Sequence, residues 1–180
     1  TNGINKAIFI HAGYPLKHEN LEKQFLSQVM DHQAIIHKVC GMYCENEEDK
    51  KDLFQEILIN LWKSFPSFRG DSTFTTWMYR VSLNVAFQRL RKTAKNREQA
   101  VLPTTFDTLN SPGKEDLPNI QRQQMYAAIE KLNEVEKAIV MLYLEENGNE
   151  EIAKIIGISQ NYVRVKMTRI RRKLKQIVEE

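Results

Sequence analysis

The sequence of 180 residues has few of the features that mark disulfide-bonded, secreted or membrane-spanning proteins. Its two cysteines, Cys40 and Cys44, are too few for a disulfide framework. No apolar run approaches the roughly 18 residues that a membrane span needs, and the first apolar stretch, residues 7–10, is too short for a signal peptide. We therefore expect an intracellular, cytoplasmic protein without membrane insertion.

Signs of an active site or a metal site are equally scarce. The chain has no glycine-rich phosphate loop and no nucleophile spaced to meet a base. Residues 47–49 are all acidic, but they fall at a predicted helix start, where the backbone dipole stabilises acids. His37, Cys40 and Cys44 share one helical face and are zinc-binding residue types, although free cysteines commonly pack in a core. We expect no catalysis, no cofactor and no metal, with zinc binding by these three residues as the alternative.

The net charge of +3 is small, but the charges are segregated along the chain. Residues 45–56 carry six acids against two lysines. Residues 72–97 carry six bases and no acid, and residues 160–176 carry seven bases and no acid. Such segregation predicts one acidic docking face and two faces that bind anions.

Helical periodicity runs through most of the chain, and no segment has a convincing strand pattern. Pro66 should end the second helix, and Asp71 or Ser72 is expected to cap the third. The predicted helices cover residues 21–44, 46–65, 74–94, 120–132, 134–144, 150–156 and 160–176.

A proline-rich stretch divides the chain. Residues 95–118 hold three of the five prolines and little periodicity, and they are long for a loop inside one compact domain. We predict an all-α fold of two small helical domains, residues 21–94 and 119–180, joined by a flexible linker over 95–118. Residues 1–20 are expected to form a flexible lead.

The end of the chain has the pattern of a helix-turn-helix. Gly157 follows a short helix and tolerates the left-handed backbone of a sharp turn, and Ser159 is a good N-cap for the helix after it. That second helix carries only positive charge, which is typical of a helix that lies in the DNA major groove. Arg164 and Arg169 are expected to read bases, and Lys173 to meet phosphate.

A second solvent-exposed basic face, besides that of the last helix, is predicted on the helix over residues 74–94. Helical spacing places an aromatic ring beside basic and amide side chains there, namely Trp77, Arg80, Asn84, Gln88 and Arg91. Aromatic rings stack on unpaired bases and amides read their edges, so this face suits a single strand. The loop before it is small and polar enough to hold a flipped base. The alternative is that Trp77 is a half-buried core aromatic and Arg80 a solvated charge.

Two stretches resemble a known family. Residues 52–92, with DLFQE, FRGDSTFTTWMYR and the basic run after them, resemble the second conserved region of bacterial sigma factors of the extracytoplasmic-function type. Residues 151–174, EIAKIIGISQNYVRVKMTRIRRKL, resemble the fourth region of the same proteins. The two occur in the family's order, with a linker between them.

The resemblance implies a sigma factor that binds core RNA polymerase, directs it to promoters and helps to melt DNA. Residues implied to dock on the polymerase clamp coiled coil are Asp52, Leu53, Gln55, Glu56 and Asn60. Residues implied to hold the melted minus-ten element are Gly70, Asp71, Ser72, Thr73, Trp77, Arg80 and Asn84, and the polar loop and the α-helical face add Phe68 and Gln88 to the expected site. Residues implied to bind the minus-thirty-five duplex are Arg164, Lys166, Thr168 and Arg169, and we expect Gln160, Asn161, Arg171 and Lys173 of the same helix to contribute.

Further partners implied by the resemblance are the polymerase flap and an anti-sigma factor. The sequence departs from the family pattern at Asn133, where proline is usual, and at Lys137, where arginine is usual. The main alternative is an ordinary dimeric helix-turn-helix regulator of duplex DNA. That alternative accounts for the C-terminal half and leaves the Trp77 face and the acidic helix unexplained.

Overall fold

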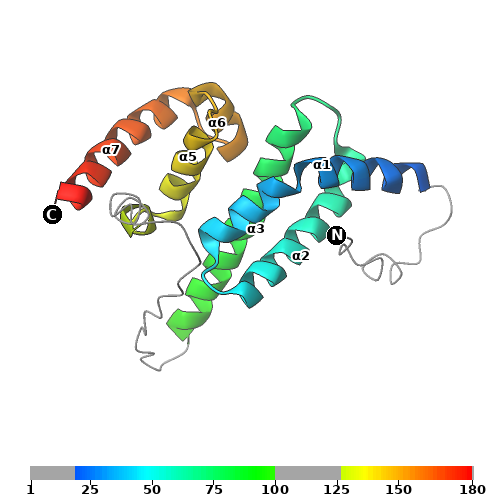
Figure 1. Ribbon diagram of the computed structural model, residues 1–180, viewed down its shortest axis with the longest axis horizontal. Coiled ribbons are helices and arrows are strands. Elements are labelled where there is room, and N and C mark those ends of the chain that lie inside the picture. Colours follow the sequence, from blue (N-terminus) through cyan, green and yellow to red (C-terminus); the bar gives the residue numbers. More distant parts are fainter. Residues whose placement is uncertain (1–18, 100–126, 180) are drawn as a thin grey trace, which may run out of the picture.

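The computed structural model describes residues 19–99 and 127–179, and these parts of the chain are built from helices joined by short loops. Figure 1 draws the elements in chain order: α1 (Glu19–Tyr43), α2 (Glu47–Ser64), the 3₁₀ helix η3 (Phe65–Ser67), α3 (Phe74–Gln99), α5 (Glu134–Leu144), α6 (Asn149–Ile156) and α7 (Gln160–Glu179). The prediction of an all-α chain is confirmed. No helix in the described parts is long and apolar enough to cross a membrane.

The predicted boundaries differ from the structure mainly at α3. This helix continues to Gln99, so the first residues of the predicted linker are helical. Residues 95–99 contain neither glycine nor proline and are mostly good helix formers, which explains the extension. The rest of the predicted linker and nearly all of the predicted lead lie outside the described residues. So does the beginning of the helix predicted at 120–132.

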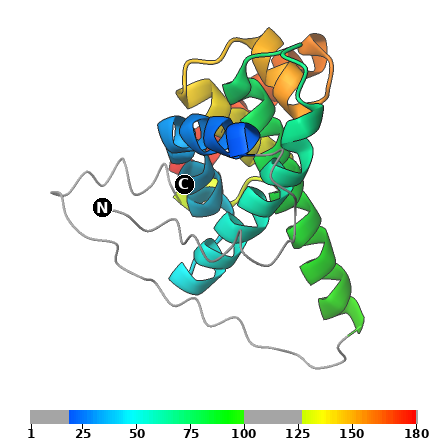
Figure 2. The same cartoon turned by 90° about the vertical axis from the view of Figure 1, so that its right-hand side faces the viewer.

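Helices α1, α2 and α3 pack together as the N-terminal domain (Figure 1). Each of them contributes one apolar stripe, and the largest fully buried side chains are Phe25, Val29 and Ile36 of α1, Leu53, Ile57 and Leu61 of α2, and Met78 and Leu83 of α3. Figure 2 shows the C-terminal part of α3 extending past the beginning of α2, so its last turns lie beyond this core.

Local sequence sets where the helices of this domain begin and end. The side chain of Asn46 accepts a hydrogen bond of 2.7 Å from the backbone N–H of Asp49 and so caps α2. Pro66 lies just after α2 in η3, as its missing N–H requires. The expected cap of α3 is wrong by one or two residues. Thr73 is the cap, because its hydroxyl accepts from the Thr76 N–H at 3.2 Å.

Helices α5, α6 and α7 form the C-terminal domain. Asn133 and Glu136 make a reciprocal capping box at the start of α5, which gives a physical role to the departure from proline at Asn133. Gly157 ends α6 with a φ of 81°, a left-handed conformation that favours glycine. The Ser159 hydroxyl accepts from the Tyr162 N–H at 3.2 Å and caps α7. The predicted helix-turn-helix is thus present in its expected place.

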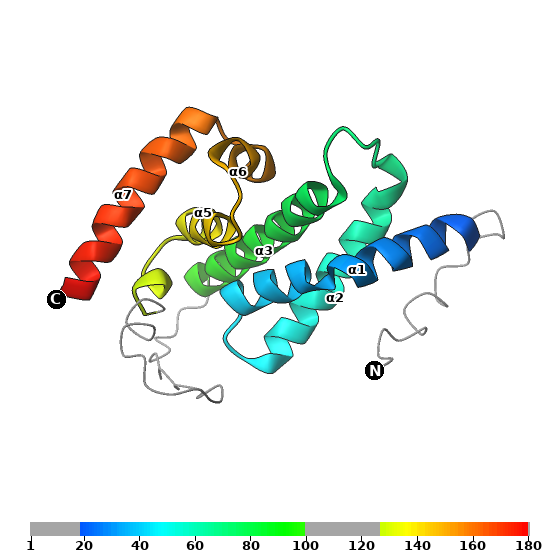
Figure 3. The ribbon, with the colours of Figure 1, turned by 45° about the horizontal axis from the view of Figure 1, so that its top comes forward.

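The two domains touch along α3 and α6, which lie side by side in Figures 1 and 3. The Thr76 hydroxyl of α3 donates to the Glu151 carboxylate of α6, and the Arg80 guanidinium donates to the backbone oxygen of Lys154. A second contact joins α1 to the α5 region, where the Tyr43 hydroxyl donates to a backbone oxygen at 2.7 Å. The helix-turn-helix therefore rests against the helix that carries Trp77.

Candidate polymerase and nucleic-acid interfaces

The residues expected to dock on polymerase lie on α2, but they do not all face outward. Asp52 and Gln55 are exposed, and Glu56 and Asn60 are half-buried. Leu53 is 1% exposed and packs in the core, so its side chain supports the helix and offers no contact surface in this conformation. The amide of Asn60 donates to the Glu56 backbone oxygen at 2.8 Å.

Sequence reasoning missed the exposed apolar residue of this face. Ile59 is 40% exposed and lies three and four residues after Glu56 and Gln55, beside them on one helical face. It falls outside the apolar stripe of α2, and that irregularity is the signal that could have found it. An apolar side chain ringed by polar groups is the usual arrangement of a protein-binding hot spot.

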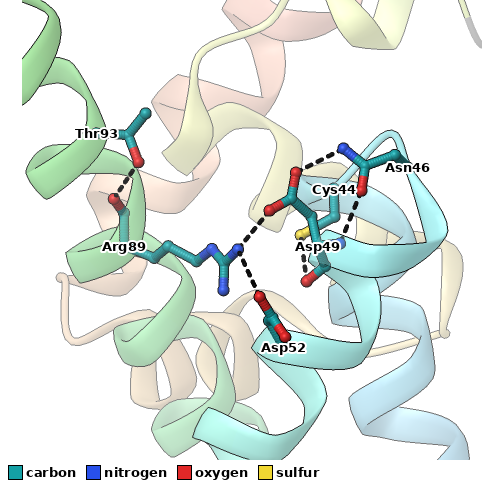
Figure 4. Close-up of polar contacts among 6 residues, drawn as sticks. All are labelled: Cys44, Asn46, Asp49, Asp52, Arg89 and Thr93. Carbon is teal, nitrogen blue, oxygen red and sulfur yellow. Dashed lines mark hydrogen bonds and ion pairs between the residues drawn. The ribbon is translucent and has the colours of Figure 1, made fainter.

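An ion pair ties the acidic start of α2 to α3 (Figure 4). Arg89 donates to the carboxylate of Asp49, and the same guanidinium lies 4.0 Å from the carboxylate of Asp52. Asp49 also accepts from the Asn46 amide at 2.6 Å. One of the six bases of residues 72–97 is therefore neutralised inside the domain. The acidic segment thus joins α2 to α3.

The alternative zinc site does not form among the described residues, where no group of three potential ligands is close enough to hold a metal. Cys40 is buried in the core, and burial raises the pKa of its thiol to about 12. The ring of His37 stacks on Phe54 with centroids 4.8 Å apart. The Cys44 thiol donates weakly to the Asp49 backbone oxygen at 3.6 Å. These side chains therefore have packing roles.

The loop before α3 is open and polar. Gly70 has a φ of 78°, Asp71 is exposed and Ser72 is half-buried. Thr73 is committed to the helix, because its hydroxyl caps α3 and lies 2.6 Å from the Thr76 hydroxyl. Arg69, Gly70 and Asp71 are exposed as well, so this loop presents polar groups to solvent.

Trp77 is the half-buried aromatic that the alternative reading expected. Its ring contacts those of Phe68, Phe74 and Phe65, with centroids 5.1, 5.3 and 6.2 Å apart. The three phenylalanines also line an open groove of about 790 Å³ between α1 and η3, together with Leu21, Lys23, Gln24, Ser27, Gln28 and Pro66. The ring therefore serves the core and adjoins a groove with aromatic walls and amide groups at its rim.

Beyond Trp77 the face of α3 is exposed, as predicted. Arg80, Asn84, Gln88 and Arg91 all lie at the surface. Arg80 is nonetheless engaged, since its Nε donates to the Lys154 backbone oxygen at 3.1 Å. Helix α6 therefore covers the beginning of this face and leaves Asn84 and Gln88 uncovered in the described parts of the chain.

Helix α7 has one buried side and one exposed side. Val163, Met167 and Ile170 are buried against α5 and α6. The predicted duplex-binding residues on the exposed side are Gln160, Asn161, Arg164, Thr168, Arg169 and Arg171. Arg171 donates to the Tyr143 hydroxyl at 3.0 Å and lies over its ring, so it is partly held by α5.

Lys166 and Lys173 are directed differently from the prediction. Both ammonium groups reach back to the Glu136 carboxylate, at 3.5 and 3.4 Å, and Lys166 is largely buried. Glu136 itself is only 9% exposed. In this conformation the two lysines therefore fasten α7 to α5 on the flank of the helix, instead of extending from its exposed side.

Glu136 is a further residue that sequence reasoning missed. Burial opposes ionisation of its carboxyl, but the Asn133 N–H, Lys173 and Lys166 outweigh burial and lower its pKa below the ordinary value. Its capping-box spacing from Asn133 is the signal in the sequence that could have identified it. Val165 and Arg172 of α7 are also exposed, and neither is among the residues predicted to bind the duplex.

Comparisons with known proteins agree with this arrangement. Residues 28–96 match the family model Sigma-70 region 2, and residues 122–174 match the model Sigma-70, region 4. The chain is 28% identical over 154 residues to RNA polymerase sigma factor SigV of Bacillus subtilis, covering 85% of this chain and 90% of SigV. It is 29% identical over 161 residues to the ECF RNA polymerase sigma-E factor of Escherichia coli K12, covering 83% and 84% of the two chains.

The fold is also that of a solved sigma factor. The structure of RpoE in complex with the anti-sigma factor NepR from Bartonella quintana matches with a TM-score of 0.66 at 17% identity, over 89% of this chain and 97% of RpoE. Both regions are matched in order, on either side of the predicted linker. The chain thus belongs to the sigma-70 family, as a sigma factor of the extracytoplasmic-function type that gives RNA polymerase its promoter specificity.

Proposed function

We propose that three separate surfaces of this sigma factor divide the work of promoter recognition. The acidic face of α2 docks on the clamp coiled coil of the polymerase. The loop at 68–73 and the exposed face of α3 hold the melted minus-ten strand, and the exposed side of α7 reads the minus-thirty-five duplex. The proposal rests on one observation above all: acidic, aromatic-amide and basic surfaces lie on different helices.

Docking on polymerase is supported by the composition of the α2 face. Asp52 and Gln55 precede the exposed Ile59 by seven and four residues and lie on the same helical face. Carboxylates speed encounter with a basic partner, and an apolar centre supplies burial once contact is made. The protein itself carries out no reaction in this scheme, since RNA synthesis belongs to the polymerase, and it acts where the polymerase is, in the bacterial cytoplasm.

Capture of a melted strand is supported by the groove beside Trp77. A base that leaves the duplex stack costs a few kcal/mol, and an aromatic-walled site with nearby hydrogen-bonding groups offsets that cost. Phe68 and Phe74 supply such walls, and the amides of Asn84 and Gln88 lie further along α3. Each base stacked on an aromatic ring contributes roughly 1–3 kcal/mol.

In the described conformation α6 packs on α3 and occupies groups proposed to bind the melted strand; this arrangement is called the closed form below. Arg80 cannot donate to a phosphate or base while its guanidinium is held at the Lys154 oxygen. Thr76 is likewise occupied by Glu151. We propose that α6 leaves α3 when the protein binds polymerase and DNA, which separates the two DNA-binding regions. An anti-sigma factor is a fitting partner for the closed form, because the related RpoE has been solved with NepR.

The proposal is tested with the full chain and core RNA polymerase. The complex is used to enrich duplexes from a random pool, and permanganate then detects unpaired thymines in the enriched duplex. A sigma factor should require core polymerase for both enrichment and melting. Duplex binding by the chain alone, with no unpaired thymines, would instead favour the dimeric helix-turn-helix regulator.

A further inference from the structure

The exposed side of α7 has a crest that is not purely basic. Successive residues of an α-helix are rotated by about 100°, so the positions opposite the buried Val163, Met167 and Ile170 form one line along the helix. That line, called the crest below, consists of Asn161, Val165, Thr168 and Arg172. All four side chains are exposed.

Val165 is the unusual member of the crest. Its side chain is 42% exposed, although burial stabilises an apolar side chain. It lies outside the hydrophobic cluster that the described residues form, and its helical neighbours include Arg169 and Arg172. Tyr162 is also exposed, but it lies off the crest and its ring is covered on one face by the Lys166 ammonium at 5.8 Å. Val165 is therefore the apolar group that α7 presents along its outermost line.

We infer that Val165 contacts the 5-methyl group of a thymine in the duplex that α7 binds. A helix in the major groove brings its crest nearest to the base edges, and the thymine methyl is the apolar group that those edges present. Arg164 and Arg169 on either side carry positive charge, which favours DNA as the partner over an apolar protein surface. The inference rests on the proposed minus-thirty-five role of α7 and adds one specified base to it.

The neighbours of Val165 leave room for this assignment. Arg164 and Arg169 lie on opposite flanks of the crest, and Thr168 donates its hydroxyl to the Arg164 backbone oxygen at 3.1 Å. Lys166 is drawn away to Glu136. The crest residue between Asn161 and Thr168 is therefore the apolar Val165, and thymine is the base whose major-groove edge suits it.

The experiment replaces single thymines by uracil, which lacks only the methyl group. A duplex enriched by the complex of the full chain with core RNA polymerase is resynthesised with deoxyuridine at one thymidine at a time. We expect one position at which uracil weakens binding of the unchanged protein about fourfold, which is about 0.8 kcal/mol for one buried methyl group. In Val165→Ala the difference between thymine and uracil at that position should disappear.

Tyr162→Ala is the matched control, because it removes an exposed apolar side chain from the same helix away from the crest. It should keep the penalty for uracil. An enriched duplex with no methyl-dependent thymine, or an equal uracil penalty in Val165→Ala, would overturn the inference and leave the proposed function standing. Loss of core polymerase binding in Val165→Ala, with uracil discrimination kept, would assign Val165 to a protein contact instead. A pool without any enrichment would overturn the proposed function itself.

Discussion

The guanidinium of Arg80 is bound to the backbone oxygen of Lys154, in the last turn of α6. Carbonyl groups at a helix C-terminus lack helical partners and carry partial negative charge, so a cation is stabilised there. Arg80 belongs to the N-terminal domain and Lys154 to the helix-turn-helix. Arg80, which is proposed to bind the melted strand, thus holds the C-terminal domain against the N-terminal domain. It cannot bind the strand and hold the C-terminal domain at the same time.

The closed form can be loosened from the side of α6. Replacing Glu151 by alanine removes the acceptor of the Thr76 hydroxyl and leaves Arg80 and its proposed strand contact intact. We expect Glu151→Ala to raise the affinity of the full chain for a labelled single strand by about threefold to tenfold, since hydrogen bonds to charged groups contribute roughly 1.5–3 kcal/mol and this one is partly exposed. Fluorescence anisotropy measures the change.

Glu150→Ala is the control for that variant. Glu150 is on the same helix and pairs with Lys154 at 2.9 Å, a contact within α6. It should leave single-strand binding unchanged. An equal gain in the two variants would point to a general charge effect and count against the closed form.

The exposed amide of Asn84 should contribute to capture of a single strand. Trp77→Ala is a poor test, because the ring has three aromatic neighbours and its removal would damage the core. Asn84→Ala removes only surface atoms, and we expect about a tenfold loss of affinity, or roughly 1.4 kcal/mol. Binding of labelled strands to the Glu151→Ala background gives the measurement.

Gln33→Ala supplies the matched control, since Gln33 is an exposed amide on α1 that is not among the residues lining the groove. If the Asn84→Ala and Gln33→Ala variants bound the strand with equal affinity, Asn84 would not belong to the strand-binding interface.

The apolar centre of the α2 face predicts the polymerase contact. Ile59→Asp should weaken binding to core RNA polymerase at least tenfold, because it places a charge where burial is expected. Gln55→Ala combined with Glu56→Lys should weaken binding as well. Helical content by circular dichroism should stay unchanged in both variants, since Ile59 and Gln55 are exposed.

Met30 offers a comparison, as an apolar residue of α1 that is even more exposed. Met30→Asp should bind core polymerase normally. The docking assignment would be wrong if Ile59→Asp bound core polymerase as tightly as Met30→Asp.

Glu136 makes the stability of the C-terminal domain depend on pH. Its pKa is lowered in the folded protein, so its contribution to the free energy of unfolding is present above the ordinary glutamate pKa of about 4.3 and is lost as the pH falls through the lower, folded value. Near neutral pH, Glu136→Gln should cost about 1–3 kcal/mol, because Lys166 and Lys173 lose a charged partner while glutamine can keep the capping bond.

Denaturant unfolding at neutral and acidic pH measures this effect. The difference between the unchanged protein and Glu136→Gln should shrink as the pH falls through the folded pKa. Glu134→Gln is the control, because Glu134 is an exposed acid of the same first turn. A difference that stays constant across the pH range would show that the Glu136 charge contributes nothing.

Local sequence determined the helices and the turn between the last two. A cap such as Ser159, a break such as Gly157 and an apolar stripe each act within one or two turns, so they can be read without knowing the fold. The bounds predicted for α5 agree with the structure for the same reason. The ordered pair of motifs also identified the family, because those residue types recur at fixed spacing.

The tertiary structure alone decided which side chains of each helix remain available. Leu53 and Trp77 are drawn into the core, Lys166 turns to Glu136, and Arg80 is held by α6. Their partners lie on other helices, and charge or helical spacing within one segment does not say where a distant helix will pack. Burial and side-chain pairing depend on contacts between distant segments. The sequence therefore identified the basic helices, whereas the packing of the helices determined which of their residues face solvent.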